Sequence, residues 1–512
     1  MNRHLSFKKL ACAGLLILAV SLPVGAAIFN TGDSCAYYLK DAGLPLYATE
    51  GDFRQAPERQ GELKEVFRRW LKESQTATVG PKGPWRPVEA RDFSFDFNRM
   101  SDSEKENLIR KGVKRSGGLA IFTSGAGLWS RGGGQVKALV PFNLTELCTP
   151  EQLSQLVHLG DVVKADSFKK VLELGGIVEP GESERAAVTR IRHQAEMGIE
   201  SILSEVRLSP RAVNSLDIKF VNAALLSRAS GSYVTLDVWT SQQTHGQIAQ
   251  YIFHLEKNFR SKSFFDDPAM DSDVKSALSD YFNKSEELGE THLFGYQEGV
   301  QGLYAPNGAL IPWEDPHAGE PAENTEYIGE GAGMLKAYMD KSGRTSRLRQ
   351  LGKTDMIFEN IEVQNNWALV YGAFAETGRN VGVVLVPQLA GESGGNGFMV
   401  MGPDGAEKME LHETAVMPES MRVGHSFFNT NTIIQSLNLS APDSMDFEKK
   451  DGGLIYRPKV NAGDITKTEP PSVLGGRRPQ EYVNQKSYQN IIADGAKVLE
   501  AAREHWMEII KH

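Results

Sequence analysis

The sequence contains few cysteines and no long apolar run beyond its first residues. With three cysteines in 512 residues, a small fold held together by many disulfides is excluded. After residue 27, no stretch reaches the roughly 20 apolar residues needed to span a bilayer, so we expect no stable membrane insertion of that part of the chain. Cys35 and Cys148 both lie after residue 27, and they either form one disulfide or remain two thiols.

The motifs of several common enzyme classes are also absent. The histidines lack the His-Glu-x-x-His spacing of metalloproteases, and no serine lies in a Gly-x-Ser-x-Gly elbow. The glycines match neither a P-loop nor a dinucleotide-binding fingerprint. Positive charge is not in excess, since the formal net charge is −9, and we therefore expect no nucleic-acid partner.

The first 27 residues have the layout of a secretory signal peptide. Cations precede the apolar run from Leu10 to Leu22, and the small residues 24–27 follow it. We expect cleavage near Ala27 and export of the mature chain to the periplasm or the medium. An uncleaved anchor is the alternative.

Changes in composition divide the rest of the chain into three parts. Residues 28–117 are polar and mixed, with a helical pattern, and predict an N-terminal helical region. Residues 118–440 alternate short β-branched runs with helical stretches. Residues 441–512 are expected to form a C-terminal appendage made of a strand-like patch at 452–460, a Pro/Gly linker at 468–479 and a helix at the end of the chain.

The middle part predicts an α/β fold. Its candidate strands are residues 118–123, 232–240, 356–363 and 381–389, and its candidate helices are residues 183–206, 244–259 and 331–343. Strands separated by helices imply βαβ units and a largely parallel, Rossmann-like sheet. In such sheets the ligand site lies at the carboxyl ends of the strands.

A glycine-rich segment follows the first of these strands. The sequence IFTSGAGLWSRGGGQVKALVP, residues 121–141, runs from a strand-like start through Gly125 and Gly127 to Arg131, a triple glycine and Lys137. Glycines after a strand let backbone N–H groups approach a phosphate, and the two cations would supply charge to the same anion. A surface loop with solvated charges is the alternative.

Several motifs in family order resemble the UDP-glucose and UDP-N-acetylhexosamine pyrophosphorylases of the eukaryotic type. The glycine-rich segment is similar to their nucleotide-binding loop, and the segments at 233–252, 293–313 and 326–343 resemble later family motifs. Residues 356–365 resemble the strand that ends Asn-Ile-Asp-Asn. The most specific match is Phe428-Asn429-Thr430-Asn431, a short distance after Glu413.

The resemblance implies a glycosyltransferase-A-like nucleotidyltransferase domain that moves a uridylyl group from UTP to a hexose 1-phosphate with the help of Mg²⁺. It also implies a role for each matching residue. Catalytic cations are Arg131 and Lys137, and the metal ligand is Glu362. The nucleotide would be bound by Gly125, Ala126, Gly127, Gln297, Gln301, Gly329 and Gly331, and the sugar by Asn360, Glu413, Asn429 and Asn431.

The sequence also departs from the family pattern. Glu362 replaces an aspartate, Ser426 and Ser393 stand where cations are usual, and Glu330 brings an acid into a loop that is normally neutral or basic. These changes favour an alternative, a secreted and catalytically degenerate member that binds a sugar nucleotide, a glycan or a protein partner. Because UTP is scarce outside the cytosol, one route to catalysis is delivery of the exported protein to the cytosol of a host cell, which would also bring it to any host target.

Overall fold

A computed structural model of the chain describes most residues from 64 onward. The described residues are 64–65, 67–72, 83–125, 128–129, 135–165, 167–241, 244–297, 299–304, 314–318, 320–328, 339–340, 343–389, 395–413, 427–440, 446–450, 455–459, 462–478 and 487–512. All of them belong to one folded unit, residues 44–512.

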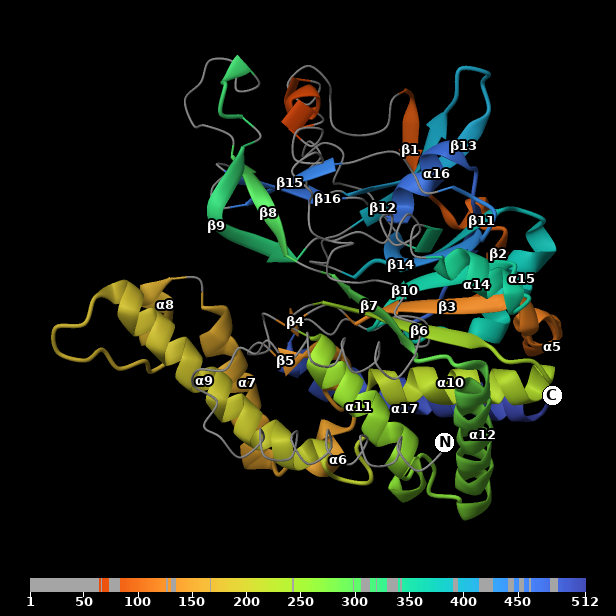
Figure 1. Ribbon diagram of the computed structural model, residues 1–512, viewed down its shortest axis with the longest axis horizontal. Coiled ribbons are helices and arrows are strands. Elements are labelled where there is room, and N and C mark those ends of the chain that lie inside the picture. Colours follow the sequence, from red (N-terminus) through yellow and green to blue (C-terminus); the bar gives the residue numbers. More distant parts are fainter. Residues whose placement is uncertain are drawn as a thin grey trace, which may run out of the picture. The chain divides into compact units, whose positions relative to one another are not determined.

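The centre of this unit is a mixed sheet whose main path contains eight strands, shown in Figure 1. In spatial order they are β2 (Phe95–Asp96), β17 (Ser472–Gly475), β11 (Val381–Pro387), β14 (Phe427–Ser436), β10 (Asp355–Asn360), β3 (Leu119–Ser124), β6 (Thr235–Ser241) and β7 (Leu293–Gln297). Strands β10, β3, β6 and β7 run parallel to one another, as do β11, β17 and β2. Strand β14 is antiparallel to both of its neighbours on this path. The expected α/β class with a largely parallel sheet is confirmed.

Two of the strands at the centre, β3 and β11, are largely apolar. In β3 and β11 nearly every residue is buried, as expected for parallel strands that are covered on both faces. Further strands extend the structure. β1 (Trp85–Pro87), β12 (Gly395–Met401) and β13 (Glu407–Glu413) continue the central sheet, and β15 (Asp446–Lys450), β16 (Ile455–Lys459), β8 (Gly299–Tyr304) and β9 (Pro321–Ile328) form a second one.

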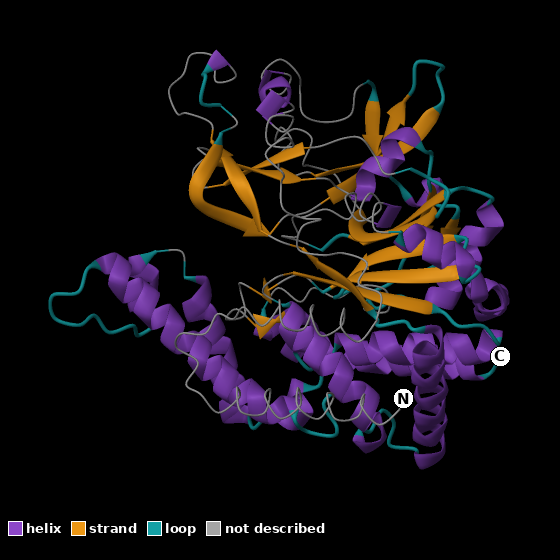
Figure 2. Cartoon of the chain, in the orientation of Figure 1, coloured by secondary structure: helices purple, strands orange, loops and turns teal. Residues whose placement is uncertain are grey.

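Helix α10 (Ser215–Ser230) is the most deeply buried helix of the described part. It begins after Asn214, whose side chain accepts a hydrogen bond from the Asp217 amide, and it ends at Gly231, whose φ is 67°. It contacts β6 on one side, and α12 (Pro268–Leu288) and α17 (Tyr488–Ile510) on others. Figure 2 shows these long helices on one side of the central sheet.

Helices α5 (Asp102–Arg115) and α15 (Trp367–Thr377) cross at two glycines. A Cβ atom on Gly112 would lie 1.8 Å from the carbonyl oxygen of Ala368, and one on Gly372 would lie 2.0 Å from that of Leu108. Only residues without a side chain permit this close approach. The crossing fixes α15 directly behind the turn that follows β10.

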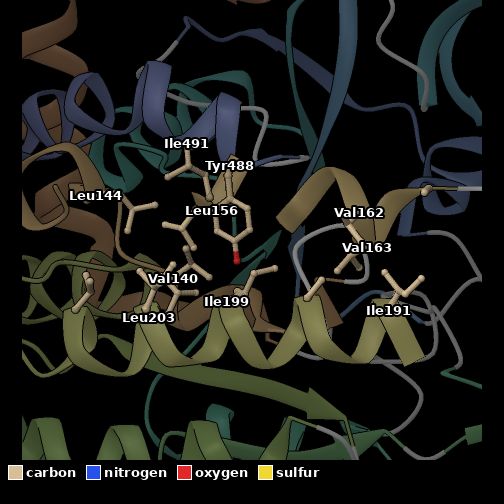
Figure 3. Packing of buried hydrophobic residues seen from close by; sticks show 14 of the residues in the cluster. Val140, Leu144, Leu156, Val162, Val163, Ile191, Ile199, Leu203, Tyr488 and Ile491 are labelled. Carbon is tan, nitrogen blue, oxygen red and sulfur yellow. The ribbon is translucent and has the colours of Figure 1, made fainter. Parts of the chain in front are cut away.

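A group of helices inserted between β3 and β6 has a core of its own. It comprises α6 (Leu144–Leu147), α7 (Pro150–Lys164), α8 (Phe168–Glu173) and α9 (Glu184–Arg207). Figure 3 shows Leu156, Ile199 and Leu203 packed against Tyr488 and Ile491 of α17. The C-terminal helix therefore joins this group to the helices under the sheet.

The segments on either side of residues 118–440 contribute to the same unit. Residues 85–87 and 95–96 add strands to a region expected to be helical. Residues 472–475 lie within the expected Pro/Gly linker, but they form β17, a strand between β2 and β11. The linker prediction is corrected here, because the backbone of this short apolar segment is paired on both sides. The expected signal peptide and its expected cleavage site lie outside the described residues.

Three further helices are shorter or lie at the surface. They are α11 (His245–Asn258), α14 (Arg344–Gln350) and α16 (Ile465–Thr468). Residues 64–65 and 67–72 are also helical. Helix α11 matches the expected helix at 244–259, whereas most of the one expected at 331–343 lies outside the described residues. None of the described helices is both long enough and apolar enough to span a membrane.

Candidate functional site

The carboxyl ends of the parallel strands bring several predicted residues to one edge of the sheet. Asn360 ends β10 and pairs in register with Ser124, the last residue of β3. Ser241 ends β6 and pairs with Gln297, the last residue of β7. Loops that follow these strands therefore emerge at the same edge, which is where α/β sheets bind ligands.

Lys137 and Glu362 meet at this edge. The Lys137 Nζ lies 2.8 Å from the Glu362 Oε1, and the two side chains are 18% and 16% exposed. Lys137 begins a short 3₁₀ turn, residues 137–139, that is anchored by the buried Ala138 and Leu139. Two residues singled out separately in the sequence are thus direct partners in the structure.

The surroundings of Glu362 keep its carboxyl ionised. Burial alone would raise its pKa, but the charge and hydrogen bond of Lys137, its own backbone and the charge of Lys219 outweigh this and lower the pKa. The pair therefore presents one positive and one negative group, each largely shielded from water. A ligand with both an anionic and a cationic part would be able to engage both.

A buried polar network lies directly behind this pair, and the sequence interpretation missed it. Lys219 of α10 is fully buried and pairs with Glu359, which is also fully buried. Asn365 donates to Glu359 at 2.7 Å, and the Trp367 indole donates to it at 3.1 Å. The signal in the sequence is a lone lysine among apolar residues, in DIKFVNAALL. A helix buried on all sides lacks the amphipathic pattern that reveals surface helices.

Gly125 follows β3, where it packs closely against α11. Its amide donates to the carbonyl of Trp239 at 2.7 Å. A Cβ atom here would lie 2.8 Å from Ile248 and 3.0 Å from Val238. In this structure the residue continues the pairing with β6 and lets the helix approach, and its amide is already bonded.

Asn429 and Asn431 lie in a bulge of β14, residues 429–432. The Asn429 amide group donates to the Asn431 side-chain oxygen at 2.9 Å, and the Asn431 backbone N–H donates to Asn429 at 3.0 Å. Asn431 has a φ of 61°, a conformation that asparagine tolerates better than most residues. Since the ladder with β10 ends at the pair Phe358–Ile433, the bulge lies at the same edge as Asn360.

For the other predicted site residues, the structure does not describe the side chains. Five lie outside the described residues: Ala126, Gly127, Arg131, Gly329 and Gly331. Three more lie in the strands β7, β8 and β13, where only the backbone is described at their positions. They are Gln297, Gln301 and Glu413. Their roles stay predictions.

The described residues contain no cluster of three or more His, Cys, Asp or Glu side chains that would hold a metal ion. Among these residues, the predicted metal site rests on the Glu362 carboxylate. Mg²⁺ is commonly held by one or two carboxylates together with substrate phosphates and water. The site fits that ion only in company with a bound phosphate.

Among the histidines, His245 and His412 have structural partners. His245 is buried and shares a hydrogen bond of 2.7 Å with Thr240, and His412 contacts Glu410 at 2.9 Å. Among the described residues Cys148 forms no disulfide, and burial raises the pKa of its thiol. Cys35 lies outside the described residues, and a disulfide between Cys35 and Cys148 stays an expectation.

Neither a protein-family model nor a curated protein matches this chain. Solved structures do match. The similar structures are UDP-sugar pyrophosphorylases. An Entamoeba histolytica protein assigned as a UDP-N-acetylglucosamine pyrophosphorylase is 11% identical, with 80% of this chain and 86% of that chain covered and a TM-score of 0.46. A variant of UDP-glucose pyrophosphorylase from Leishmania major is 13% identical, covers 91% and 79%, and has a TM-score of 0.47.

The corresponding protein from Trypanosoma brucei, named a UDP-glucose phosphorylase, is 14% identical at the same coverage and the same TM-score of 0.47.

Proposed function

We propose that this protein is a nucleotidyltransferase that moves a uridylyl group from UTP to a hexose 1-phosphate. The observation that carries the proposal is the Lys137–Glu362 pair, at 2.8 Å, at the carboxyl edge of the parallel strands. The sequence motifs around both residues support it, because they resemble the nucleotide loop and the metal-binding strand of UDP-sugar pyrophosphorylases.

The reaction makes modest demands on the protein. A phosphate oxygen of the sugar 1-phosphate attacks the α-phosphorus of UTP, the bond between the α-phosphorus and the bridging oxygen breaks, and pyrophosphate leaves with the electron pair. The protein must align two anions and neutralise charge that grows on the α-phosphoryl group. No covalent nucleophile is needed, so the absence of one from the motifs is consistent with the proposal.

The ion pair supplies the two charges that such a ligand requires. The Lys137 ammonium would bind phosphate oxygens, and the Glu362 carboxylate, kept ionised by its neighbours, would hold Mg²⁺ beside them. When bound, the metal neutralises phosphate charge. Before a ligand binds, the charge of each side chain is compensated by the other. The ion pair therefore holds both charged groups at the edge of the sheet.

Asparagines at the same edge fit the sugar. Asn360 ends β10, and Asn429 and Asn431 form the bulge of β14. Amide side chains both donate and accept hydrogen bonds, which suits sugar hydroxyls. We assign these three residues to the hexose.

Phosphorus NMR of the full chain with UTP, Mg²⁺ and glucose 1-phosphate tests the proposal, and N-acetylglucosamine 1-phosphate serves as the second substrate. New diphosphate-sugar and pyrophosphate signals, lost on addition of EDTA, are the expected result. Unchanged spectra with both sugars would refute uridylyl transfer. Mg²⁺-dependent thermal stabilisation by UTP in that case would identify a degenerate binding protein.

A further inference from the structure

The turn that carries Glu362 is held at both of its ends by one buried ammonium group. Lys219 pairs with the carboxylate of Glu359, immediately before the turn, and donates to the carbonyl oxygen of Val363, immediately after it. The turn itself is closed by a hydrogen bond of 3.1 Å from the Val363 N–H to the Asn360 carbonyl. Glu362 therefore lies between two points fixed by the same side chain.

The charges involved are fully removed from water. Lys219 and Glu359 are each 0% exposed, and the ammonium also lies 5.4 Å from the centre of the Trp367 ring. Burying two charges costs several kcal/mol per ion, and well-packed apolar residues are often at least as stable in such a place. Stability alone is thus a weak reason for this pair, whereas a fixed geometry at the neighbouring turn is a specific one.

The same network reaches the second segment of the proposed site. The Asn365 amide donates to Glu359 and also to the Thr432 hydroxyl at 2.9 Å. Thr432 accepts in turn from Thr430 at 3.0 Å. These two threonines flank Asn431 in the bulge of β14, so the turn after β10 and the bulge are joined by buried hydrogen bonds.

We propose that Lys219 is a positioning residue that sets the place of Glu362 and, through Asn365, of the asparagines in the β14 bulge. Lys219 is itself too deeply buried to touch a substrate and acts through the turn. Its effect on turnover rests on the proposed function, whereas its effect on the geometry of the two segments does not. The Lys219 network is defined as Lys219, Glu359, Asn365, Trp367 and Thr432.

The test removes both charges together, because a single change leaves an unpaired buried charge. In Lys219→Met/Glu359→Gln the Asn365 amide keeps an acceptor, but the Val363 carbonyl loses its donor. Lys353→Met is the matched control. Lys353 is also a buried lysine that donates to two carbonyl oxygens, those of Gly117 and Tyr233, and these precede the first residues of β3 and β6.

Hydrogen exchange measured by mass spectrometry on the full-length protein gives the first readout. The double variant should exchange amides at residues 360–366 about tenfold faster than the wild type, and Lys353→Met should not. Asn365→Ala should speed exchange at residues 429–432 and leave the Val363 amide protected. Equal exchange at 360–366 in the wild type and the double variant would overturn the proposal, as would a uniform increase along the chain.

Steady-state kinetics with UTP and the preferred sugar 1-phosphate gives the second readout. A misplaced Glu362 should lower kcat by about 10- to 100-fold and change the KM for UTP by less than about twofold, because Lys137 is untouched. Lys353→Met should keep its kcat. If the wild type does not turn over, the proposed function fails and the exchange data still decide the positioning role. If the double variant does not fold, Asn365→Ala still tests the link from the turn to the β14 bulge, and unchanged exchange at residues 429–432 would overturn that part of the proposal.

Discussion

Lys137 Nζ lies 2.8 Å from Glu362 Oε1, and this contact joins the 3₁₀ turn 137–139 to the turn after β10. The two strands are parallel neighbours paired in register from Leu119–Asp355 to Ser124–Asn360. Their carboxyl ends therefore coincide, and Glu362 lies directly beyond the end of β10. Lys137 reaches the same edge through the 3₁₀ turn 137–139, whose Ala138 and Leu139 are buried.

Lys137→Met and Glu362→Gln should each lower kcat/KM by about 100- to 1000-fold, because each removes a charge from a preorganised site. End-point or coupled assays of pyrophosphate release measure the decrease in kcat/KM. Lys111→Met is the matched control, since it breaks an ion pair of 2.7 Å with Glu376 that is 39% and 33% exposed. That variant should keep wild-type activity; full activity in Lys137→Met would remove the residue from the site.

Two substitutions at Asn431 distinguish the contribution of its backbone conformation to stability from the contribution of its side chain to sugar binding. Its φ is 61°, so Asn431→Gly removes the side chain without strain, whereas Asn431→Ala costs about 1 kcal/mol or more in the left-handed region. Urea unfolding should show that difference. Both variants should raise the KM for the sugar 1-phosphate to a similar extent, because both lack the amide. A normal KM in both would exclude the residue from the sugar site.

Much of the fold follows from local pattern. The expected helix at 183–206 is observed as Glu184–Arg207, because one apolar stripe and an N-cap serine are both visible in the sequence. The strands at 118–123 and 381–389 are found within two residues of their expected ends. Such elements are specified by the residues within them.

Other elements depend on contacts that sequence pattern does not reveal. β17 spans residues 472–475 beside prolines, and its partners are residues 382–385 and 95–96. The four residues of β17 contain no local pattern that indicates pairing with strands so far away in the sequence. In the same way, motifs predict Lys137 and Glu362 one by one, whereas the Lys219 network depends on contacts among α10, the end of β10 and the β14 bulge.

Gly495 should be indispensable for the attachment of the C-terminal helix. A Cβ atom at this position would lie 1.9 Å from the carbonyl oxygen of Phe142, a backbone atom that cannot move aside cheaply. Gly495→Ala should therefore destabilise the fold by about 3 kcal/mol. Lys497→Ala on the same helix is the control, since Lys497 is 61% exposed, and its effect should stay within about 0.5 kcal/mol. Equal thermal unfolding temperatures for the two variants would contradict the tight packing seen here.

Three buried histidines should make the fold sensitive to mild acid. Burial lowers the pKa of His245 and His292 to about 4 and that of His505 to about 3. In the unfolded chain an imidazole titrates near pH 6.5, so only the unfolded state binds these protons just below that pH. Stability should therefore be unaffected by them above pH 6.5 and should fall as the pH drops from about 6.5 toward 4, by about 1.4 kcal/mol per pH unit for each histidine.

His505→Gln tests this dependence directly. It should lower the number of protons taken up on unfolding at pH 5 by about one, measured as the slope of unfolding free energy against pH in urea titrations. His158→Gln, the same replacement at an exposed position, is the control for the substitution itself. If His505→Gln keeps the wild-type slope, the imidazole must gain its proton in the folded protein as readily as in the unfolded chain. The burial around α17 would then be looser than the contact of Trp506 with Asn222, at 2.6 Å, indicates.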